Sequence, residues 1–170
     1  MKTILILAMH GSPPNDFPRR ELGEFFSLHA RFEAEGHRMD EVSRSRYTEL
    51  DHKMRSWPRT AENDPFYAAS LSLARQIESE SGLETRVCFN EFCAPTLEEV
   101  VKQVVEEGFQ RIVVVTPMMT RGGEHAEVEI PTQIQQLQSD FPPVHFIYAW
   151  PFREEEIARF LSAQVRRFLE

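Results

Sequence analysis

The chain has 170 residues, of which 41% are apolar and 27% are charged, and its formal net charge is −8 at pH 7. This length and composition predict a single globular domain that buries a core without needing disulfides or a structural metal. The acidic balance argues against nucleic acid as a partner, and no apolar stretch is long enough to span a bilayer, so we expect no membrane partner either.

The first third of the chain predicts one strand and one helix. Residues 3–9 form a continuous apolar run, which is typical of a strand covered on both faces. Residues 19–35 carry apolar side chains at helical spacing. Residues 37–62 are charged and polar with scattered apolar positions, and this pattern leaves three interpretations open: a short helix, an ordered lid or a mobile loop.

A helix, a strand and a second helix are predicted next. Residues 63–81 begin with a polar cap and a proline, and then carry apolar residues on one helical face. Residues 85–92 predict a strand on which Glu91 shares the side of the apolar positions. Residues 95–107 predict a helix that opens with a capping box.

The last part of the chain repeats the alternation. Residues 111–117 form the most β-branched strand, and a helix is predicted to start near Pro131. Residues 144–150 predict a fourth strand, and residues 154–169 predict an amphipathic helix. This order indicates one α/β domain whose parallel sheet has helices on both faces, with all four strand ends at one edge.

That edge carries the residues that we expect to be functional. His10 follows the first strand, Glu91 ends the second, and His125 lies in the glycine-containing loop after the third. Ligands of open parallel sheets bind at this edge, and imidazole both ligates metals and moves protons near neutral pH. The sequence therefore predicts metal or proton chemistry in one crevice. The remaining histidines, His29, His37, His52 and His145, are weaker candidates.

Glu129 lies four residues after His125, so the two share a face if the segment is helical, although Pro131 would interrupt such a helix. Glu129 could fix the tautomer of the imidazole or contact a metal directly. Met118 and the following methionine are flexible apolar side chains that would suit a flat macrocycle. The two cysteines, Cys88 and Cys93, match no redox or zinc spacing; we expect buried thiols and a cytoplasmic location.

Three segments together resemble the small sirohydrochlorin chelatases of the CbiX/SirB type, which are class II chelatases related in fold to ferrochelatase. That family shows a first strand that ends in HGS, a segment like FLE…PSLEE, and an apolar strand that leads to GGHxxxDIP. The matching segments here are His10–Gly11–Ser12, residues 87–99 and residues 113–131. Two departures are that Glu124 separates the glycines from His125, and that Glu129 replaces the usual aspartate.

The resemblance implies a three-layer chelatase-like domain over residues 1–170, with a four-stranded parallel sheet flanked by helices. It also implies an insertion at about residues 19–62, which would be a lid or an oligomer contact. The implied activity is ATP-independent insertion of Co²⁺, Fe²⁺ or Ni²⁺ into a sirohydrochlorin-type tetrapyrrole, as in cobalamin or siroheme biosynthesis. The metal is then a substrate, and no tightly bound cofactor is expected. The chain would act as a homodimer, or as a monomer whose insertion supplies missing walls.

The resemblance also assigns roles to residues. His10 and His125 would present the metal and accept protons, and Glu91, with Glu129 as a further metal contact, would relay protons or steady the metal. Ser12, Met118 and Arg121 would line the tetrapyrrole cleft; arginines are needed there because this acidic protein would bind a substrate with many carboxylates. Two other functions stay open: a tetrapyrrole or metal carrier that uses the same cleft, and an unrelated α/β phosphate-ester hydrolase.

Overall fold

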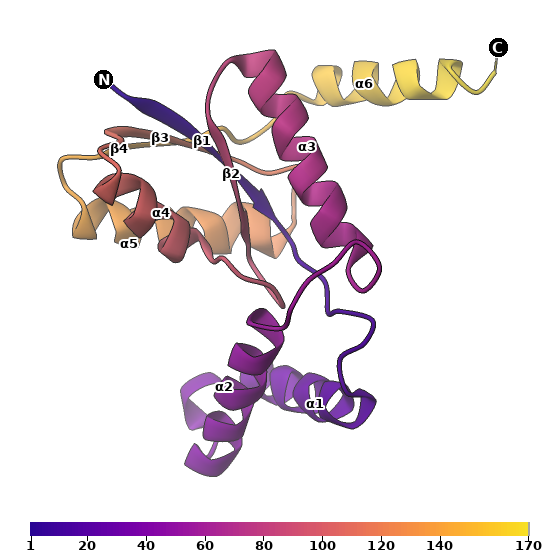
Figure 1. Ribbon diagram of the computed structural model, residues 1–170, viewed down its shortest axis with the longest axis vertical. Coiled ribbons are helices and arrows are strands. Elements are labelled where there is room, and N and C mark those ends of the chain that lie inside the picture. Colours follow the sequence, from indigo (N-terminus) through magenta and orange to yellow (C-terminus); the bar gives the residue numbers. More distant parts are fainter. Residues whose placement is uncertain (170) are drawn as a thin grey trace.

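The computed structural model describes residues 1–169 and contains a four-stranded parallel sheet with helices on both faces (Figure 1). The strand order is β2-β1-β3-β4, and the strands are β1 (Thr3–Met9), β2 (Thr85–Phe89), β3 (Arg111–Val115) and β4 (His145–Tyr148). The helices are α1 (Arg19–Glu35), η1 (Gly36–Arg38), α2 (Glu41–Arg55), α3 (Pro65–Ser81), α4 (Leu97–Glu106), η2 (His125–Glu129), α5 (Ile130–Asp140) and α6 (Glu154–Arg166). The predicted α/β fold is confirmed.

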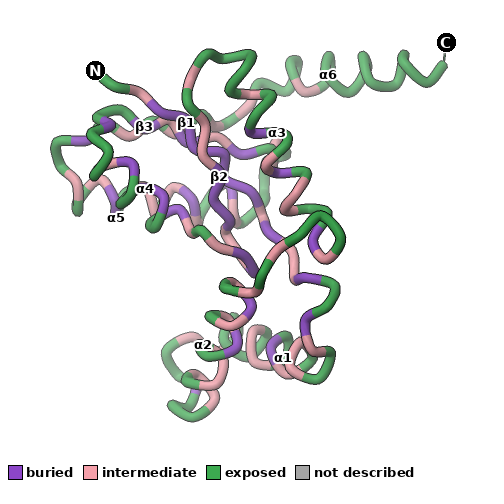
Figure 2. Tube along the Cα trace, in the orientation of Figure 1, coloured by how far each residue is buried: buried purple, intermediate pink, exposed green. Residues whose placement is uncertain are grey.

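The two faces of the sheet bury alternate residues of the same strands. Ile4, Ile6 and Ala8 of β1 pack in the core under α4 and α5, whereas Leu5 and Leu7 pack under α3. This division follows from the two-residue period of a strand, and it explains why residues 3–9 read as a continuous apolar run. Figure 2 shows the buried strands at the centre of the three layers.

Residues 19–55, for which the sequence left part of the structure open, form two helices joined by a short 3-10 turn. Asp40 caps α2 by accepting a hydrogen bond from the Ser43 backbone N–H at 2.9 Å, and this bond lowers the pKa of Asp40 to about 2. The hairpin has a small core of its own, which also includes Phe92 from the main domain. The core residues are Phe17, Phe25, Leu50, Met54 and Phe92. Residues 19–55 are therefore an ordered helical unit beside the sheet (Figure 1). We call this unit the α1–α2 insertion, after the insertion predicted at about residues 19–62.

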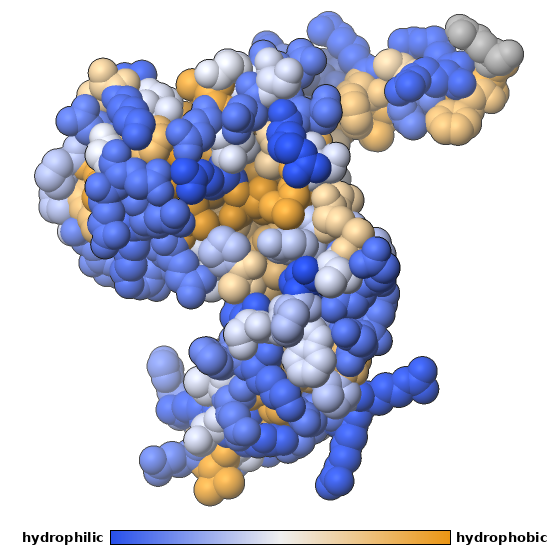
Figure 3. All heavy atoms as spheres, in the orientation of Figure 1, coloured by the Kyte–Doolittle hydropathy of each residue, from blue (hydrophilic) through white to orange (hydrophobic). Residues whose placement is uncertain are grey.

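The final helix forms where the sequence predicts it, but it has no buried residue. Its apolar side chains, among them Phe160 and Leu161, are 62% and 52% exposed. Helix α6 projects from the body of the protein (Figures 1 and 3). On the α3 side of the sheet, Val113 is consequently only partly buried and its partner Ile147 is 37% exposed.

Both cysteines are buried, as expected from the sequence. Burial raises the pKa of the Cys88 thiol, and it raises that of Cys93 to about 11, so both thiols stay protonated at neutral pH. Within residues 1–169, no helix combines the length and the apolar character that a bilayer crossing needs.

Candidate metal centre

Three side chains from different parts of the chain converge at the carboxyl edge of the sheet. His10 follows β1, Glu91 follows β2, and His125 opens η2 after β3. Each offers one ligand atom, and these three atoms lie within 4.8 Å of one another. The rings of His10 and His125 meet edge to face at a centroid distance of 4.6 Å. The structure thus brings together the three residues that the sequence placed at this edge.

A close backbone contact holds His10 next to Glu91. Gly11 adopts a φ of +103°, and a Cβ atom there would lie 1.9 Å from the Glu91 carbonyl oxygen. The Glu91 N–H donates to the His10 carbonyl at 2.8 Å. Only glycine permits this conformation and this approach, so the glycine after His10 is a structural requirement of the site.

Glu91 does not lie on the strand as the sequence predicted. Strand β2 ends at Phe89, and Glu91 occupies the bend that follows. The reason is local backbone geometry: Phe92 has a φ of +59°, and the Cys93 N–H turns back to the Glu91 carbonyl at 2.6 Å. A bulky residue in the left-handed region costs of order 1–3 kcal/mol, and such strain clusters at functional sites.

Hydrogen bonds set the tautomers of the two histidines. Nδ1 of His10 lies 3.1 Å from the Gly11 carbonyl, and Nδ1 of His125 lies 2.7 Å from a carboxylate oxygen of Glu129. A carbonyl and a carboxylate only accept, so in each ring Nδ1 carries the proton. In the neutral imidazoles, Nε2 of both rings then keeps its lone pair, which is the form that ligates a metal.

The spacing of His10 and Glu91 suits an ion between them. Nε2 of His10 and Oε2 of Glu91 are 3.7 Å apart, which is too long for a hydrogen bond. Two N or O atoms that each lie about 2.0–2.2 Å from one tetrahedral metal are roughly 3.5 Å apart. The donor set of two imidazoles and one carboxylate accepts several divalent transition metals.

A π-turn resolves the conflict at Pro131. Residues His125–Glu129 form one π-helical turn, closed by the Ile130 N–H bonding to the His125 carbonyl. The wider turn lets the chain enter α5, with Pro131 in its first turn. It also stacks Glu129 beside His125, and π-turns of this kind occur often at functional sites. Glu129 therefore contacts the far nitrogen of His125 and is outside the converging triad.

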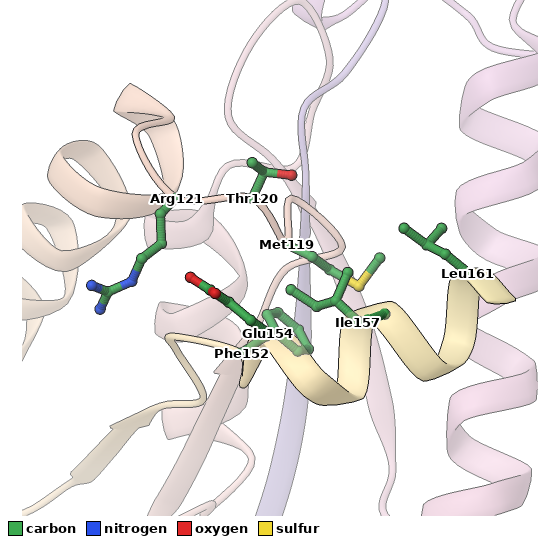
Figure 4. A pocket seen from close by; sticks show the side chains of 8 residues that line it. Met119, Thr120, Arg121, Phe152, Glu154, Ile157 and Leu161 are labelled. Carbon is green, nitrogen blue, oxygen red and sulfur yellow. The ribbon is translucent and has the colours of Figure 1, made fainter.

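The three residues predicted to line a tetrapyrrole cleft lie in different surroundings. Ser12 is half-buried, and its hydroxyl bonds to the adjacent Pro13 carbonyl. Met118 packs against the core under α4 and α5. Arg121 is exposed and lines a pocket of about 350 Å³ between the loop after β3 and α6. Figure 4 shows Met119 beside Ile157 of α6 in this pocket.

The sequence interpretation missed a buried arginine that fastens the site's loops together. The Arg59 side chain is 5% exposed and forms an ion pair with the buried Asp64. It also donates to the carbonyl oxygens of Ser12, Met54 and Phe92. No periodic pattern marks such a residue, because two of its partners, Ser12 and Phe92, lie far from it in the sequence.

The sequence interpretation also gave little weight to His29 on α1. The structure places His29 Nε2 3.8 Å from Glu91 Oε1, and His29 Nδ1 3.0 Å from the Tyr47 hydroxyl of α2. A usable signal was present: His29 lies four residues after Phe25, on the buried face of the same helix. His37, His52 and His145 are exposed.

The α/β domain thus presents two imidazoles and a carboxylate, a donor set that suits a divalent transition metal, at the carboxyl edge of its sheet. A sequence model of the CbiX family matches residues 62–167. This match covers more than half of the chain, so the chain belongs to the CbiX family, as the resemblance had indicated. The matched region includes Glu91, His125 and Glu129, whereas His10 and the α1–α2 insertion lie outside it.

Individual relatives match shorter stretches. A sirohydrochlorin ferrochelatase from Priestia megaterium is 34% identical over 84 residues, which is 49% of this chain and 30% of the relative. A sirohydrochlorin cobaltochelatase from Methanopyrus kandleri is 38% identical over 63 residues, which is 36% of this chain and 43% of the relative. The chain thus spans less than half the length of either relative.

A solved structure extends the similarity in fold to the whole chain. A protein from Marinobacter aquaeolei VT8, named as a CbiX protein of cobalamin (vitamin B12) biosynthesis, aligns with a TM-score of 0.54 at 17% identity. The alignment covers 98% of this chain and 97% of that one. At this identity the likeness concerns the fold.

Proposed function

We propose that this protein inserts a divalent metal, Co²⁺, Fe²⁺ or Ni²⁺, into a sirohydrochlorin-type tetrapyrrole without ATP, as in cobalamin or siroheme biosynthesis. The observation that carries the proposal is the convergence of His10, Glu91 and His125 within 4.8 Å in a chain of the CbiX family. The names of the curated relatives, one a ferrochelatase and one a cobaltochelatase, support the class of reaction.

Metal insertion needs a group that presents the ion and bases that take two pyrrole protons. In the proposed mechanism, Nε2 of His10 and Nε2 of His125 hold the incoming ion together with Glu91. As the macrocycle nitrogens replace them as ligands, the freed imidazoles accept the displaced protons, because a neutral imidazole is a competent base near pH 7. Glu129 stays on Nδ1 of His125 and stabilises the imidazolium that forms.

The cleft is proposed to lie beside the loop after β3. Arg121 is exposed at this loop and pairs only loosely with Glu127, at 3.9 Å, so its guanidinium is available for a substrate carboxylate. Arg19 and Arg20 are exposed at the start of α1 and could bind others. Ser12 and Met118 are proposed to contact the ring.

The test is metallation of sirohydrochlorin, followed by its visible spectrum, with Co²⁺, Fe²⁺ and Ni²⁺ in turn and without nucleotide. We expect acceleration with at least one metal. His10→Ala and His125→Ala should each lower the rate at least about 100-fold, on the scale of losing a general base. His145→Ala is the matched control, since His145 is exposed at the start of β4, at the opposite edge of the sheet. No acceleration with any of the metals would refute the proposal.

The same assay separates the two rival functions. A carrier would metallate or bind only one equivalent of tetrapyrrole, so progress would stop at the protein concentration. A phosphate-ester hydrolase would turn over a generic phosphate ester, and His10→Ala would abolish that activity. Multiple turnovers of tetrapyrrole with no phosphatase activity are expected.

We also propose that the active form is a homodimer. The α6 stripe is exposed at Phe160, Leu161 and Val165, and on the α3 side of β3 and β4 the sheet has a partly bare face at Val113 and Ile147. In a dimer, the stripe of one copy would cover an apolar face of the other, and stable dimers bury roughly 1,200–2,000 Å² in total. Light scattering of the purified protein should give twice the chain mass, and Phe160→Glu with Leu161→Glu should give a monomer.

A further inference from the structure

The α1–α2 insertion contacts the loop of Glu91 from both of its helices. Arg55 of α2 donates to the carbonyl oxygens of Asn90 and Cys93, and His29 of α1 approaches the Glu91 side chain. His29 of α1 faces Glu91 at 3.8 Å, on the side of the carboxylate away from His10. Its ring stacks on Phe25 at 5.7 Å and packs near Phe92 at 6.4 Å. The side chain is 22% exposed. These apolar neighbours limit how the ring can turn.

The hydrogen bonds of His29 differ from those of the two ligand histidines. His10 and His125 have acceptors at Nδ1, which leaves their Nε2 lone pairs free. At His29, Nδ1 faces the Tyr47 hydroxyl at 3.0 Å, which can donate to it. Burial raises the pKa of Tyr47 to about 12, so this hydroxyl keeps its proton.

The facing groups select the tautomer. When Tyr47 donates to Nδ1 of His29, the ring proton sits on Nε2, which points at Glu91 Oε1. An ionised carboxylate only accepts, so this tautomer is favoured over the one with a bare Nε2 lone pair. The present 3.8 Å is longer than a hydrogen bond, but the last torsion of a glutamate is soft and can close the gap.

We infer that His29 is a positioning residue of the metal centre, which holds one oxygen of Glu91 so that the other oxygen faces His10 and the ion. The inference rests on the proposed function, because it assigns His29 to the metal-presenting carboxylate. This role differs from that of a metal ligand, because His29 presents an N–H donor to Glu91. The insertion then preorganises the centre, and a small cavity of about 140 Å³ lined by His29, Tyr47 and Glu91 lies beneath it.

The test measures Co²⁺ affinity of the full chain without tetrapyrrole, by titration calorimetry and by the visible spectrum of bound Co²⁺. Partners of metal ligands typically contribute 10- to 100-fold in affinity, so His29→Leu should raise the Kd for Co²⁺ about 10-fold. His29→Gln places an amide N–H near the position of Nε2 and should restore most of the affinity. Tyr47→Phe should cause a smaller loss, because the tautomer is no longer fixed.

Kinetics give an independent readout. His29→Leu should raise KM for Co²⁺ by a similar factor and leave KM for sirohydrochlorin nearly unchanged. His52→Ala, at an exposed histidine of α2, is the control and should change neither value. If the role of His29 were purely structural, His29→Leu and His29→Gln would lose thermal stability alike. KM for Co²⁺ would then not rise separately from KM for sirohydrochlorin.

Three outcomes would overturn the inference. The first is unchanged Co²⁺ affinity in His29→Leu. The second is failure of His29→Gln to restore affinity together with an altered spectrum of bound Co²⁺, which would make His29 a ligand. The third applies if His29→Leu does not fold. In that case the inference fails if Tyr47→Phe keeps its full Co²⁺ affinity and His29→Gln binds Co²⁺ no better than unfolded protein. Since binding is measured without tetrapyrrole, failure of the chelatase reaction leaves this result readable.

Discussion

Two helical regions project from the sheet, and they differ in what covers their apolar faces (Figure 1). The α1–α2 insertion buries Phe25, Leu50 and Met54 in a core of its own. Helix α6 buries no residue, although its sequence is as clearly amphipathic. The first region reaches the metal centre through His29, whereas the second flanks only the pocket at Arg121.

The difference shows that an apolar stripe determines a helix but does not determine its partner. The insertion closes on itself because its two helices are joined by a short turn and pack against each other. A lone helix of 13 residues is marginal in water unless a tertiary surface covers it. Stability should therefore respond strongly to changes in the insertion and weakly to changes in α6.

The largest effect is expected at the anchor of the insertion. Arg59→Met leaves Asp64 buried without its ion pair, and losses of this kind are about 3–5 kcal/mol in the free energy of unfolding. Urea denaturation of Arg59→Met measures this loss in the free energy of unfolding. The control is Arg46→Met, which breaks a more exposed pair with Glu24 and should change stability much less. Equal effects would mean that Arg59 does not anchor the loops.

Core truncations compare the two regions directly. Leu50→Ala removes a fully buried side chain and should destabilise the protein by about 2–5 kcal/mol. Leu161→Ala removes a side chain that is 52% exposed in the single chain. Urea denaturation of the monomeric form should show a change within about 0.5 kcal/mol for Leu161→Ala. A larger loss would mean that α6 is packed in the monomer.

A smaller effect is expected at the cap of α2. Asp40→Ala removes the acceptor for the Ser43 N–H and should lower the stability of the protein by less than the core truncation does. The folded-state pKa of Asp40 lies below its ordinary value, at about 2, so its stabilisation is present above pH 4 and is lost as the pH falls toward 2. Unfolding curves at pH 7 and pH 2.5 should therefore differ less for Asp40→Ala than for the unaltered chain.

The last effect is confined to alkaline pH and is absent at neutral pH. Burial raises the pKa values of Tyr47 and Tyr148 to about 12, so folded protein keeps protons that unfolded chains release near pH 10. Stability should be complete below pH 10 and fall between pH 10 and 12. In Tyr47→Phe, and likewise in Tyr148→Phe, unfolding curves should show a smaller loss of stability between pH 10 and 12. An unchanged slope in both variants would contradict the assigned burial.

Several parts of the structure could be predicted because they depend on neighbours in sequence. The run 3–9 predicts a strand covered on both faces, and Thr96 with Glu99 predicts the start of α4, where the structure shows the capping box. The predicted parallel topology also places His10, Glu91 and His125 at one edge of the sheet. The π-turn at His125 was not predictable, because it settles a conflict between Pro131 and an otherwise helical segment.

The sequence by itself determined the order of strands and helices and the edge at which the histidines gather, because periodicity and chain connectivity act locally. Only the tertiary structure decided that Glu91 leaves its strand, that Arg59 bonds to the distant carbonyls of Ser12 and Phe92, and that His29 faces Glu91. It also decided that no residue of α6 within the described chain becomes buried. These outcomes depend on contacts between residues far apart in sequence, which no local pattern encodes.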